Sequence, residues 1–332
     1  MFVQLREERE AKELELLAPE ATKSAESRGR LDAEDPDRYR TAFELDRDRI
    51  THSKAFRRLK HKTQVFMNSE GDHYVTRMTH TLQVTQIGRS MARGLGLNED
   101  LTEAICLGHD VGHTPFGHTG EDALDPYVEG KWLHSEQSVR VMSLLEPLNL
   151  SWEVLDGIRA HSWKVNPPPT SPEGYLCRFS DRIAYLTHDV QDAIRADVIS
   201  YSDIPAAYLK VLGDEPGPSW ISTMVSAVVD ASAAAGKVTM SDNVLSVMHE
   251  LRAFMFERVY LRPEAHDQKE RAIYVIRQLV DFFSAHSEQI PSTFQLSGET
   301  PTSQAIDYVA GMTDRFAVQE HDRIFRLRLF PN

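Results

Sequence analysis

The stretch THTLQVTQIGRSMARGLGL at residues 79–97 decides the fold class, because its apolar residues follow the period of an α-helix. Four of them recur at spacings of three and four: Val84, Ile87, Met91 and Leu95. Asn98, a residue type that caps helix N-termini well, follows directly. We therefore expect a long amphipathic helix over 79–97 and a second helix that runs from Asn98 toward His109.

Helical periodicity continues along most of the chain, and no run shows the sustained two-residue alternation of strands. Thr119 and Ser135 are expected to cap two shorter helices. Longer helices are expected over residues 175–197, 219–235, 241–261, 264–286 and 301–319. The pattern predicts an all-α protein with three parts: a polar N-terminal arm at 1–45, a helical-bundle core at 46–200, and a helical C-terminal extension packed on that core at 201–332.

Bulk composition excludes several classes of protein. The 332 residues are 41% hydrophobic and 26% charged, as in an ordinary globular protein, and no run of apolar residues is long enough for a membrane span. The charged N-terminus does not look like a signal peptide, and Cys106 and Cys177 have no metal or disulfide spacing, so we expect a cytoplasmic protein. A net charge of −13 argues against broad binding of nucleic acid, although the basic run at 54–62 (KAFRRLKHK) could form a local phosphate pocket.

Three separated segments carry candidate metal ligands: THTL at 79–82, GHDVGH at 108–113 and FSDRIAYLTHD at 179–189. Together they supply two imidazoles and two carboxylates: His80, His109, Asp110 and Asp181. Mixed nitrogen and oxygen ligands suit Mn²⁺, Mg²⁺, Fe²⁺ or Co²⁺, with positions left for water and substrate. We expect the adjacent pair His109 and Asp110 to reach one ion near a helix end, where Gly108 and Gly112 let the backbone approach.

Each member of this set has an ordinary explanation when it stands alone. A single histidine on an amphipathic helix is more often a core or surface residue, and His188-Asp189 is a second HD dipeptide in the same chain. The ordered set His…His-Asp…Asp is far more specific. It matches the signature of the HD superfamily of metal-dependent phosphohydrolases, which implies an HD-domain helical bundle and one divalent ion.

A longer resemblance surrounds the HD pair and covers about residues 28–195. Four stretches resemble deoxyguanosinetriphosphate triphosphohydrolases: LDRDRITHSKAFRRLKHKTQVF (45–66), RMTHTLQVTQIGRSMARGL (77–95), HDVGHTPFGHTGE (109–121) and SDRIAYLTHDVQDA (180–193). GMTDRFA at 311–317 looks like a further family segment. The resemblance implies hydrolysis of a deoxynucleoside triphosphate, such as dGTP, to a deoxynucleoside and tripolyphosphate.

Such a reaction needs neutralised phosphate charge, an attacking water and a proton for the departing 5′-oxygen. A metal serves the first need and can activate the water, and histidine is the natural acid near neutral pH. His118 with Glu121 would make a carboxylate-oriented imidazole, and His113 would share a face with His109 if the helix continued by one turn. The resemblance places the matches of His118, Glu121 and His134 in the catalytic site of relatives, although a helix-start residue is the ordinary explanation of His134.

Four further residues are expected to contact the nucleotide: Gln64, Arg77, Tyr185 and Asp189. Arg77 precedes His80 by three residues, which directs it toward the metal, and its guanidinium suits a phosphate. Tyr185 and Asp189 continue the helical stripe of Asp181 at intervals of four. The resemblance implies that Tyr185 packs under the sugar and excludes a 2′-hydroxyl, while Gln64 and Asp189 bond the 3′-hydroxyl. The ordinary alternatives are a surface ion pair, a solvated glutamine, and a core tyrosine beside solvated acids.

Three other functions stay open. Another HD phosphohydrolase, a nucleotidase or phosphodiesterase, shares the metal set but has no need of the sugar contacts. A non-catalytic sensor of deoxynucleoside triphosphates would keep the fold without turnover, and a nuclease would admit single-stranded ends near residues 54–62. The resemblance further implies a homo-oligomer, for which a hexamer is one candidate, with nucleic acid as a regulator at most and no membrane partner.

Overall fold

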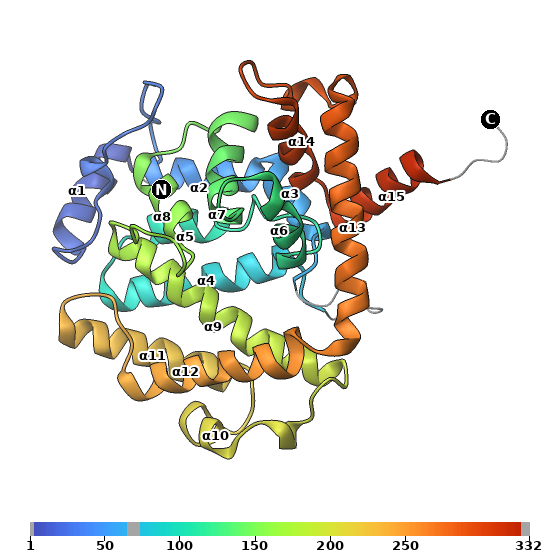
Figure 1. Cartoon of the computed structure of the whole chain (residues 1–332). Helices are drawn as coiled ribbons and strands as arrows, with labels where there is room; N and C mark the ends of the chain where they lie inside the picture. The colour runs from blue at the N-terminus through green and yellow to red at the C-terminus, as the bar shows by residue number, and fades with distance from the viewer. Residues whose placement is uncertain (1–2, 65–73, 327–332) are drawn as a thin grey trace.

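The computed structural model of the chain describes residues 3–64 and 74–326 (Figure 1). Within those ranges the protein is built from α-helices, with no strand beyond two isolated β-bridges, so the predicted all-α fold is confirmed. The helices are α1 (Arg6–Leu16), α2 (Ala42–His52), α3 (Lys54–Arg58), α4 (Arg77–Leu95), α5 (Glu99–Gly108), α6 (His118–Leu124), α7 (His134–Arg140), α8 (Trp152–Ala160), α9 (Pro172–Arg195), α10 (Ala206–Leu212), α11 (Pro218–Ala235), α12 (Asp242–Met255), α13 (Pro263–Ala285), α14 (Pro301–Ala310) and α15 (Asp314–Phe325). Two π-helical turns extend α7 and α12: Val141–Leu145 and Phe256–Tyr260.

Side-chain caps explain where the long helices of the site begin. The Thr76 side chain accepts a hydrogen bond from the backbone of Thr79 at the start of α4. Asn98 accepts one from Leu101 and begins α5, which confirms the cap expected from the sequence. Ser171 caps α9 in the same way. These caps set the rotation of the three helices that carry the candidate metal ligands.

Two predicted caps and one predicted helix are wrong. Helices α6 and α7 each begin two residues earlier than expected, after Gly117 and Leu133, so Thr119 and Ser135 lie inside the first turn. The helix expected over 301–319 is divided into α14 and α15, because Thr313 caps a new helix at that point.

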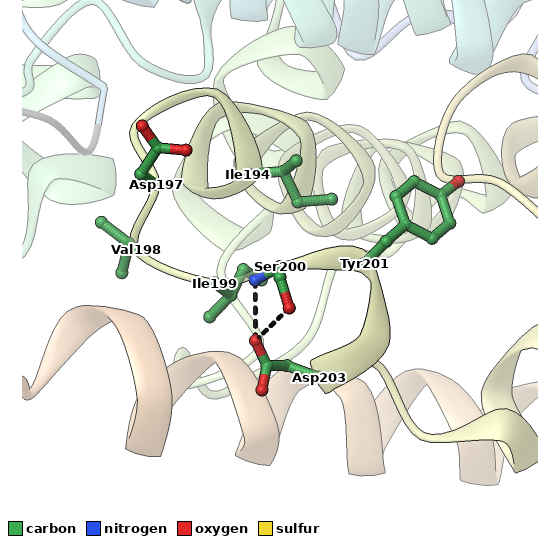
Figure 2. Close-up of a pocket in the computed structure, with 7 residues that line it drawn as sticks. All are labelled: Ile194, Asp197, Val198, Ile199, Ser200, Tyr201 and Asp203. Atoms are coloured by element: carbon green, nitrogen blue, oxygen red, sulfur yellow. Dashed lines mark hydrogen bonds between the residues drawn. The ribbon is translucent and has the colours of Figure 1, made fainter.

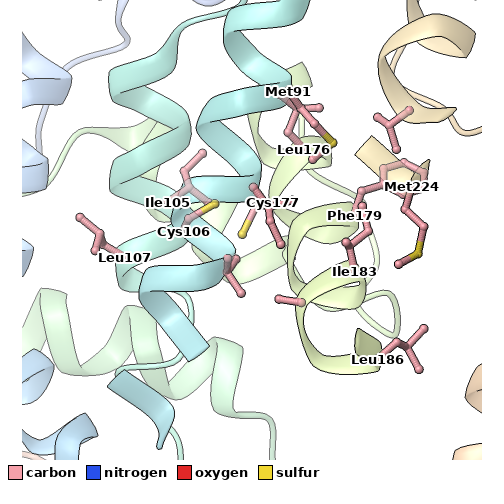
Figure 3. Close-up of a cluster of buried hydrophobic side chains, with 14 of the residues drawn as sticks. Met91, Ile105, Cys106, Leu107, Leu176, Cys177, Phe179, Ile183, Leu186 and Met224 are labelled. Atoms are coloured by element: carbon pink, nitrogen blue, oxygen red, sulfur yellow. The ribbon is translucent and has the colours of Figure 1, made fainter. Parts of the chain in front are cut away.

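The main hydrophobic core lies between α4, α5 and α9, with α11 and α12 packed below α9 (Figure 1). Figure 3 shows side chains of α5 and α9 facing each other, among them Ile105 and Leu176. Cys106 and Cys177 belong to this facing set and are both free and buried. The core therefore anchors α5 and α9 immediately before the residues at which the candidate ligands occur.

A second, separate hydrophobic cluster joins α6 to the C-terminal helices. Leu124 of α6 and Trp132 are buried with apolar side chains of α13 and α14, such as Phe283 and Val309. In Figure 1 α13 and α14 stand together beside α6, on the opposite side from α1. Residues 201–332 thus contribute to both clusters, since α11 and α12 belong to the main one.

The N-terminal segment, expected to form an arm, is held on the core of its own chain by buried carboxylates. Glu173 accepts hydrogen bonds from Thr22, and Glu153 accepts one from the backbone of Arg28. Arg30 is paired with the fully buried Asp46 of α2. No helix among the described residues has the length and apolar character needed to cross a membrane.

Candidate functional site

The four candidate metal ligands come together from three parts of the core. His80 lies in the first turn of α4, His109 and Asp110 directly follow α5, and Asp181 lies in α9. His80 Nε2 is 3.1 Å from Asp181 Oδ1, which is 4.0 Å from His109 Nε2. His109 Nε2 is in turn 3.5 Å from Asp110 Oδ1. His80, His109 and Asp110 have ligand atoms within 4.8 Å of one another, as the ligands of one ion require, and Asp181 lies beside both histidines.

Close packing at the end of α5 lets the adjacent pair turn toward one point. A Cβ atom on Gly108 would lie 2.4 Å from Ile158, and one on Gly112 would lie 2.2 Å from the backbone nitrogen of Ser138. At Gly112 the contacts are backbone atoms that cannot rotate away, so glycine is needed there, whereas at Gly108 the closest atom is the terminal methyl of a side chain. The α-helix ends at Gly108, close to the predicted end near His109, so the condition under which His113 would share a helical face with His109 is not met.

The donor set fits a divalent cation. Cys106 O accepts a hydrogen bond from His109 Nδ1 at 2.7 Å, which leaves the lone pair of Nε2 facing inward, and this buried atom has no hydrogen-bond partner among the described residues. Burial lowers the pKa of His109 and keeps the ring neutral, as a ligand must be. Burial opposes ionisation of Asp110 and Asp181, but the surrounding imidazoles and, for Asp110, an arginine hold both pKa values below the usual range. The set thus presents the neutral nitrogen of His109 and the charged oxygens of Asp110 and Asp181.

Arg77 is buried behind the ligands. Its guanidinium donates to Asp110 Oδ2 at 2.8 Å and to the backbone oxygens of Thr63, at 3.1 Å, and Gln64, at 3.4 Å. A Cβ atom on Gly117, whose φ is +61°, would approach this guanidinium to 3.0 Å. Arg77 therefore orients Asp110 and secures the chain before the candidate sugar contact at Gln64.

A second cluster contains all four residues expected to handle protons. Ligand atoms of His113, His118, Glu121 and His134 lie within 4.8 Å of one another. Glu121 Oε1 is 2.5 Å from His134 Nδ1, and its Oε2 is 3.1 Å from His118 Nδ1. The rings of His113 and His134 stack with centroids 4.5 Å apart. The His118 side chain is 70% exposed, whereas the others are buried or nearly so, so His118 is the member that an entering molecule meets.

Charge in this cluster is shared between Glu121 and His134. Burial opposes the charged form of both, but each stabilises the other: the pKa of Glu121 lies well below its ordinary value and that of His134 is raised. Burial lowers the pKa of His113 well below its ordinary value. Glu121 is therefore a carboxylate that accepts hydrogen bonds from two imidazoles.

His161, which sequence reasoning missed, connects the two clusters. It follows α8, and its Nε2 lies 3.0 Å from His134 Nε2, while its ring centroid is 5.0 Å from that of His109. Burial lowers its pKa to about 3. The segment RAHSW at 159–163 has no recognisable ligand spacing, so only the packing of α8 against α5 and α7 identifies this residue.

Asp314 explains why the GMTDRFA segment belongs with the site. Its carboxylate accepts hydrogen bonds from the backbone of Thr63 at 2.9 Å and of Phe116 at 3.0 Å. The first bond holds the residue before Gln64, and the second holds the turn before His118. One carboxylate at the start of α15 thus positions two segments that lie more than fifty residues apart.

The candidate sugar contacts Tyr185 and Asp189 follow Asp181 on one face of α9, toward the C-terminal end of the helix. Asp189 lies two helical turns beyond Asp181 on α9 and accepts a hydrogen bond from Tyr260 Oη at 2.6 Å. Burial raises the pKa of Asp189 to about 7. Tyr185 is partly buried between the two acids, and Gln64 Oε1 is a buried acceptor without a hydrogen-bond partner in the described chain. Tyr260 was missed because its contact depends on how the π-helical turn after α12 packs on α9.

The basic run at 54–62 does not form one solvent-facing patch. Lys62 points inward, where its ammonium bonds the carbonyl oxygens of His113 and Ala310, and burial lowers its pKa to about 7. Lys54 and Lys60 are exposed. The charges of Arg182 and Arg252, which lie outside this run, both act on Tyr185.

A surface pocket elsewhere holds none of the predicted site residues. It lies after the end of α9 and is lined by residues between Ile194 and Asp203 (Figure 2). Asp203 accepts hydrogen bonds from the backbone and side chain of Ser200 there. Its lining has no histidine.

Comparisons with known proteins agree with this architecture. Residues 77–197 match the HD domain, and residues 238–323 match the phosphohydrolase-associated domain. A deoxyguanosinetriphosphate triphosphohydrolase-like protein from Caldanaerobacter subterraneus subsp. tengcongensis is 48% identical, over 97% of this chain and 96% of the relative. One of the same description from Desulfatibacillum aliphaticivorans is 44% identical, over 97% of this chain and 98% of the relative.

A solved structure shares the fold at a greater distance. The crystal structure of a hypothetical protein from Aquifex aeolicus is 21% identical and has a TM-score of 0.50, covering 86% of this chain and 72% of that one. The near-full-length similarity to the relatives above carries the assignment. The chain therefore belongs to the deoxyguanosinetriphosphate triphosphohydrolase-like family and is an HD-domain phosphohydrolase.

Proposed function

We propose that the protein hydrolyses deoxynucleoside triphosphates, such as dGTP, to a deoxynucleoside and tripolyphosphate. One observation carries this proposal: the metal-ligand set and the proton-handling cluster meet, with Asp110 Oδ1 only 3.8 Å from His134 Nε2. A phosphate held at the first cluster is thereby within reach of the second. The names of the relatives support this substrate class.

The phosphate end would be held by the metal ligands and Arg77. His80, His109, Asp110 and Asp181 would bind Mn²⁺, Mg²⁺, Fe²⁺ or Co²⁺, which supplies charge neutralisation and a water of lowered pKa when bound. Arg77 uses three N–H groups on Asp110 and the backbone, and a guanidinium has five. The remaining donors can bond a phosphate oxygen.

Proton delivery would fall to His118. Its Nδ1 donates to Glu121, so its Nε2 is the atom available to give a proton to the departing 5′-oxygen. His134 donates to the other oxygen of the same carboxylate and fixes its position. His113, stacked on His134, restrains that ring. The exposure of His118 allows it to protonate again from solvent.

The sugar would lie along α9. Asp189 uses one oxygen for Tyr260, and the other can accept a hydrogen bond from the 3′-hydroxyl. The unpartnered Gln64 Oε1 can accept a second one. Tyr185 stands between Asp181 and Asp189 on the same stripe, where its ring would fill the space of a 2′-hydroxyl.

Product analysis tests the proposal. The purified chain is incubated with each dNTP and NTP under the four metals, and the phosphate product is separated by ion-exchange chromatography. We expect tripolyphosphate from dNTPs, no turnover for His109→Ala or Asp110→Ala, and wild-type rates for His286→Leu, an exposed histidine of the C-terminal region. Orthophosphate or a monophosphate would instead identify another HD phosphohydrolase, and tight dNTP binding without turnover would identify a sensor.

We further propose a cytoplasmic homo-oligomer, with a hexamer as one candidate and nucleic acid as a regulator only. Both cysteines are free, which suits a reducing compartment. Leu16 and Leu31 of the N-terminal segment are 73% and 85% exposed, and apolar surface of this kind suits a contact between copies. Light scattering with and without single-stranded DNA measures the oligomeric state and its response to nucleic acid. A monomer under all conditions would reject the oligomer.

A further inference from the structure

The turn that precedes His118 has an unusual backbone and no cap of its own. Phe116 has a φ of +61°, a left-handed conformation that residues other than glycine rarely adopt, and Gly117 has the same φ. Helix α6 begins at His118, and Gly117 at its N-cap position has no side chain that could accept a hydrogen bond from the first turn. Within the turn, Thr114 Oγ1 donates to the carbonyl of Gly117 at 2.8 Å. The backbone N–H of Phe116 therefore has to be satisfied from another part of the chain.

The C-terminal helices supply this support. Asp314 lies in the first turn of α15, and its Oδ1 accepts a hydrogen bond from the backbone N–H of Phe116 at 3.0 Å. The ring of Phe116 packs against the second hydrophobic cluster, to which α13 and α14 contribute. Both the backbone and the side chain of this residue are thus held by the far end of the chain. A residue other than glycine keeps a left-handed conformation only where its surroundings hold it in this way.

The ring of His118 depends on the backbone of this turn more than the neighbouring imidazoles depend on theirs. Its side chain is 70% exposed, so few atoms pack against it, and it is aligned by a hydrogen bond of 3.1 Å to Glu121. The rings of His113 and His134 are enclosed and stack on each other, so packing fixes their positions. The position of His118 Nε2 therefore follows from the direction in which the turn presents the residue.

A second contact joins the same three segments. The other oxygen of Asp314 accepts a hydrogen bond from the backbone N–H of Thr63 at 2.9 Å. Lys62, the residue before Thr63, is fully buried and donates to the carbonyl oxygens of His113 and Ala310. Lys62 would therefore keep the segments together in a protein that lacks the carboxylate. A change at Asp314 should release the turn while the surrounding helices stay packed.

We propose that Asp314 is a positioning residue for proton delivery: by holding the turn at Phe116, it directs His118 Nε2 toward the departing 5′-oxygen. The inference rests on the proposed function, in which His118 is the proton donor. A displacement of about 1 Å in a reacting group can lower a rate about 100-fold. This loss reaches the reaction only through His118, whereas a general loss of stability would lower the rate of every variant by the same factor.

A double-mutant cycle tests the proposal on the full chain, with radiolabelled dGTP and Mn²⁺. We expect Asp314→Ala to lower kcat about 100-fold in the wild-type background, but less than about threefold in His118→Ala, which has no donor left to misplace. KM should rise in both backgrounds, because Asp314 also holds the chain before Gln64. The matched control is Asp322→Asn, an exposed carboxylate two turns further along α15, which should keep the wild-type kcat and KM.

Amide hydrogen exchange gives a second readout that needs no turnover. The Phe116 N–H should exchange about fivefold faster in Asp314→Ala than in wild type or Asp322→Asn, because it has lost its acceptor. If Asp314→Ala fails to fold, Asp314→Leu replaces it in both measurements, since leucine keeps the branched shape of the carboxylate but offers no acceptor.

An unchanged kcat, equal losses of kcat in both backgrounds, or wild-type exchange at Phe116 would overturn the proposal. Faster exchange at Phe116 in a protein that hydrolyses no dNTP would reject the proposed function, and with it the role in proton delivery, but not the hold of Asp314 on the turn.

Discussion

Replacing Gly112 with alanine would push the loop of His109 and Asp110 away from α7. The new Cβ would lie 2.2 Å from the backbone nitrogen of Ser138 and 2.5 Å from the carbonyl carbon of Gln137. Ordinary contact begins at 3.4 Å, so the two segments must separate by about an ångström. Both neighbours are backbone atoms, and no side chain can rotate to relieve the contact.

The expected loss in the free energy of unfolding combines the cost of this contact with the loss of two hydrogen bonds beside it. Overpacking costs about 1–3 kcal/mol. Ser138 Oγ accepts from Gly112 N and bonds His109 O, each at 2.9 Å, and losing these two bonds costs about 1 kcal/mol apiece. We expect Gly112→Ala to lower the free energy of unfolding by about 3–5 kcal/mol. A displacement of about 1 Å at His109 should also reduce turnover about 100-fold.

Gly94→Ala is the control, because it adds a methyl within α4 whose nearest neighbour among the described residues, Val229, is 3.4 Å away. Removing a helical glycine should stabilise the protein by about 0.5–1 kcal/mol. Urea titrations followed by circular dichroism measure both variants, and Mn²⁺ binding follows the site. Equal stability and equal Mn²⁺ affinity in Gly112→Ala and wild type would refute the close-packing argument.

Three more predictions concern the proposed nucleotide site. His118→Ala should lower kcat by about 100- to 10,000-fold with little change in KM, because it removes the proton donor; steady-state kinetics that show equal losses in both would contradict this role. Tyr185→Ala should raise the relative rate on ribonucleotides by about tenfold or more, measured with matched dGTP and GTP, and unchanged selectivity would reject the steric gate. The Asp189 pKa is raised by burial to about 7, so its protonated form stabilises the fold fully below the unfolded pKa, and this stabilisation is lost as pH rises toward 7. Urea titrations from pH 4 to 8 should therefore show a steeper fall for wild type than for Asp189→Asn, and parallel curves would contradict the raised pKa.

Sequence periodicity predicted the helices that carry His80 and Asp181 because both are long and have one apolar face. The loop of His109 and Asp110 was predicted from its flanking glycines, which have a steric reason to be there. Helix starts near His118 and His134 were misplaced by two residues, because neither helix has a side-chain cap. Local capping rules give no signal at such starts.

Contacts between distant segments could not be predicted. Tyr260 bonds Asp189 across 71 residues, and His161 reaches His134 only through the packing of α8 on α7. The N-terminal segment was predicted to be a polar arm because the sequence does not show which of its charged residues form ion pairs. In the fold its Arg30 is paired with Asp46, which is fully buried in α2.

The Lys62 ammonium has a consequence for how the chain can be shortened. It ties the carbonyl of His113 to that of Ala310 in α14, while Leu124 of α6 depends on the same C-terminal helices for cover. Truncation before α13 would leave the packing of α4, α5 and α9 intact. It would remove the apolar side chains that cover α6, the helix that carries His118. The segment that matches the HD domain therefore relies on apolar side chains from the far end of the chain to cover α6.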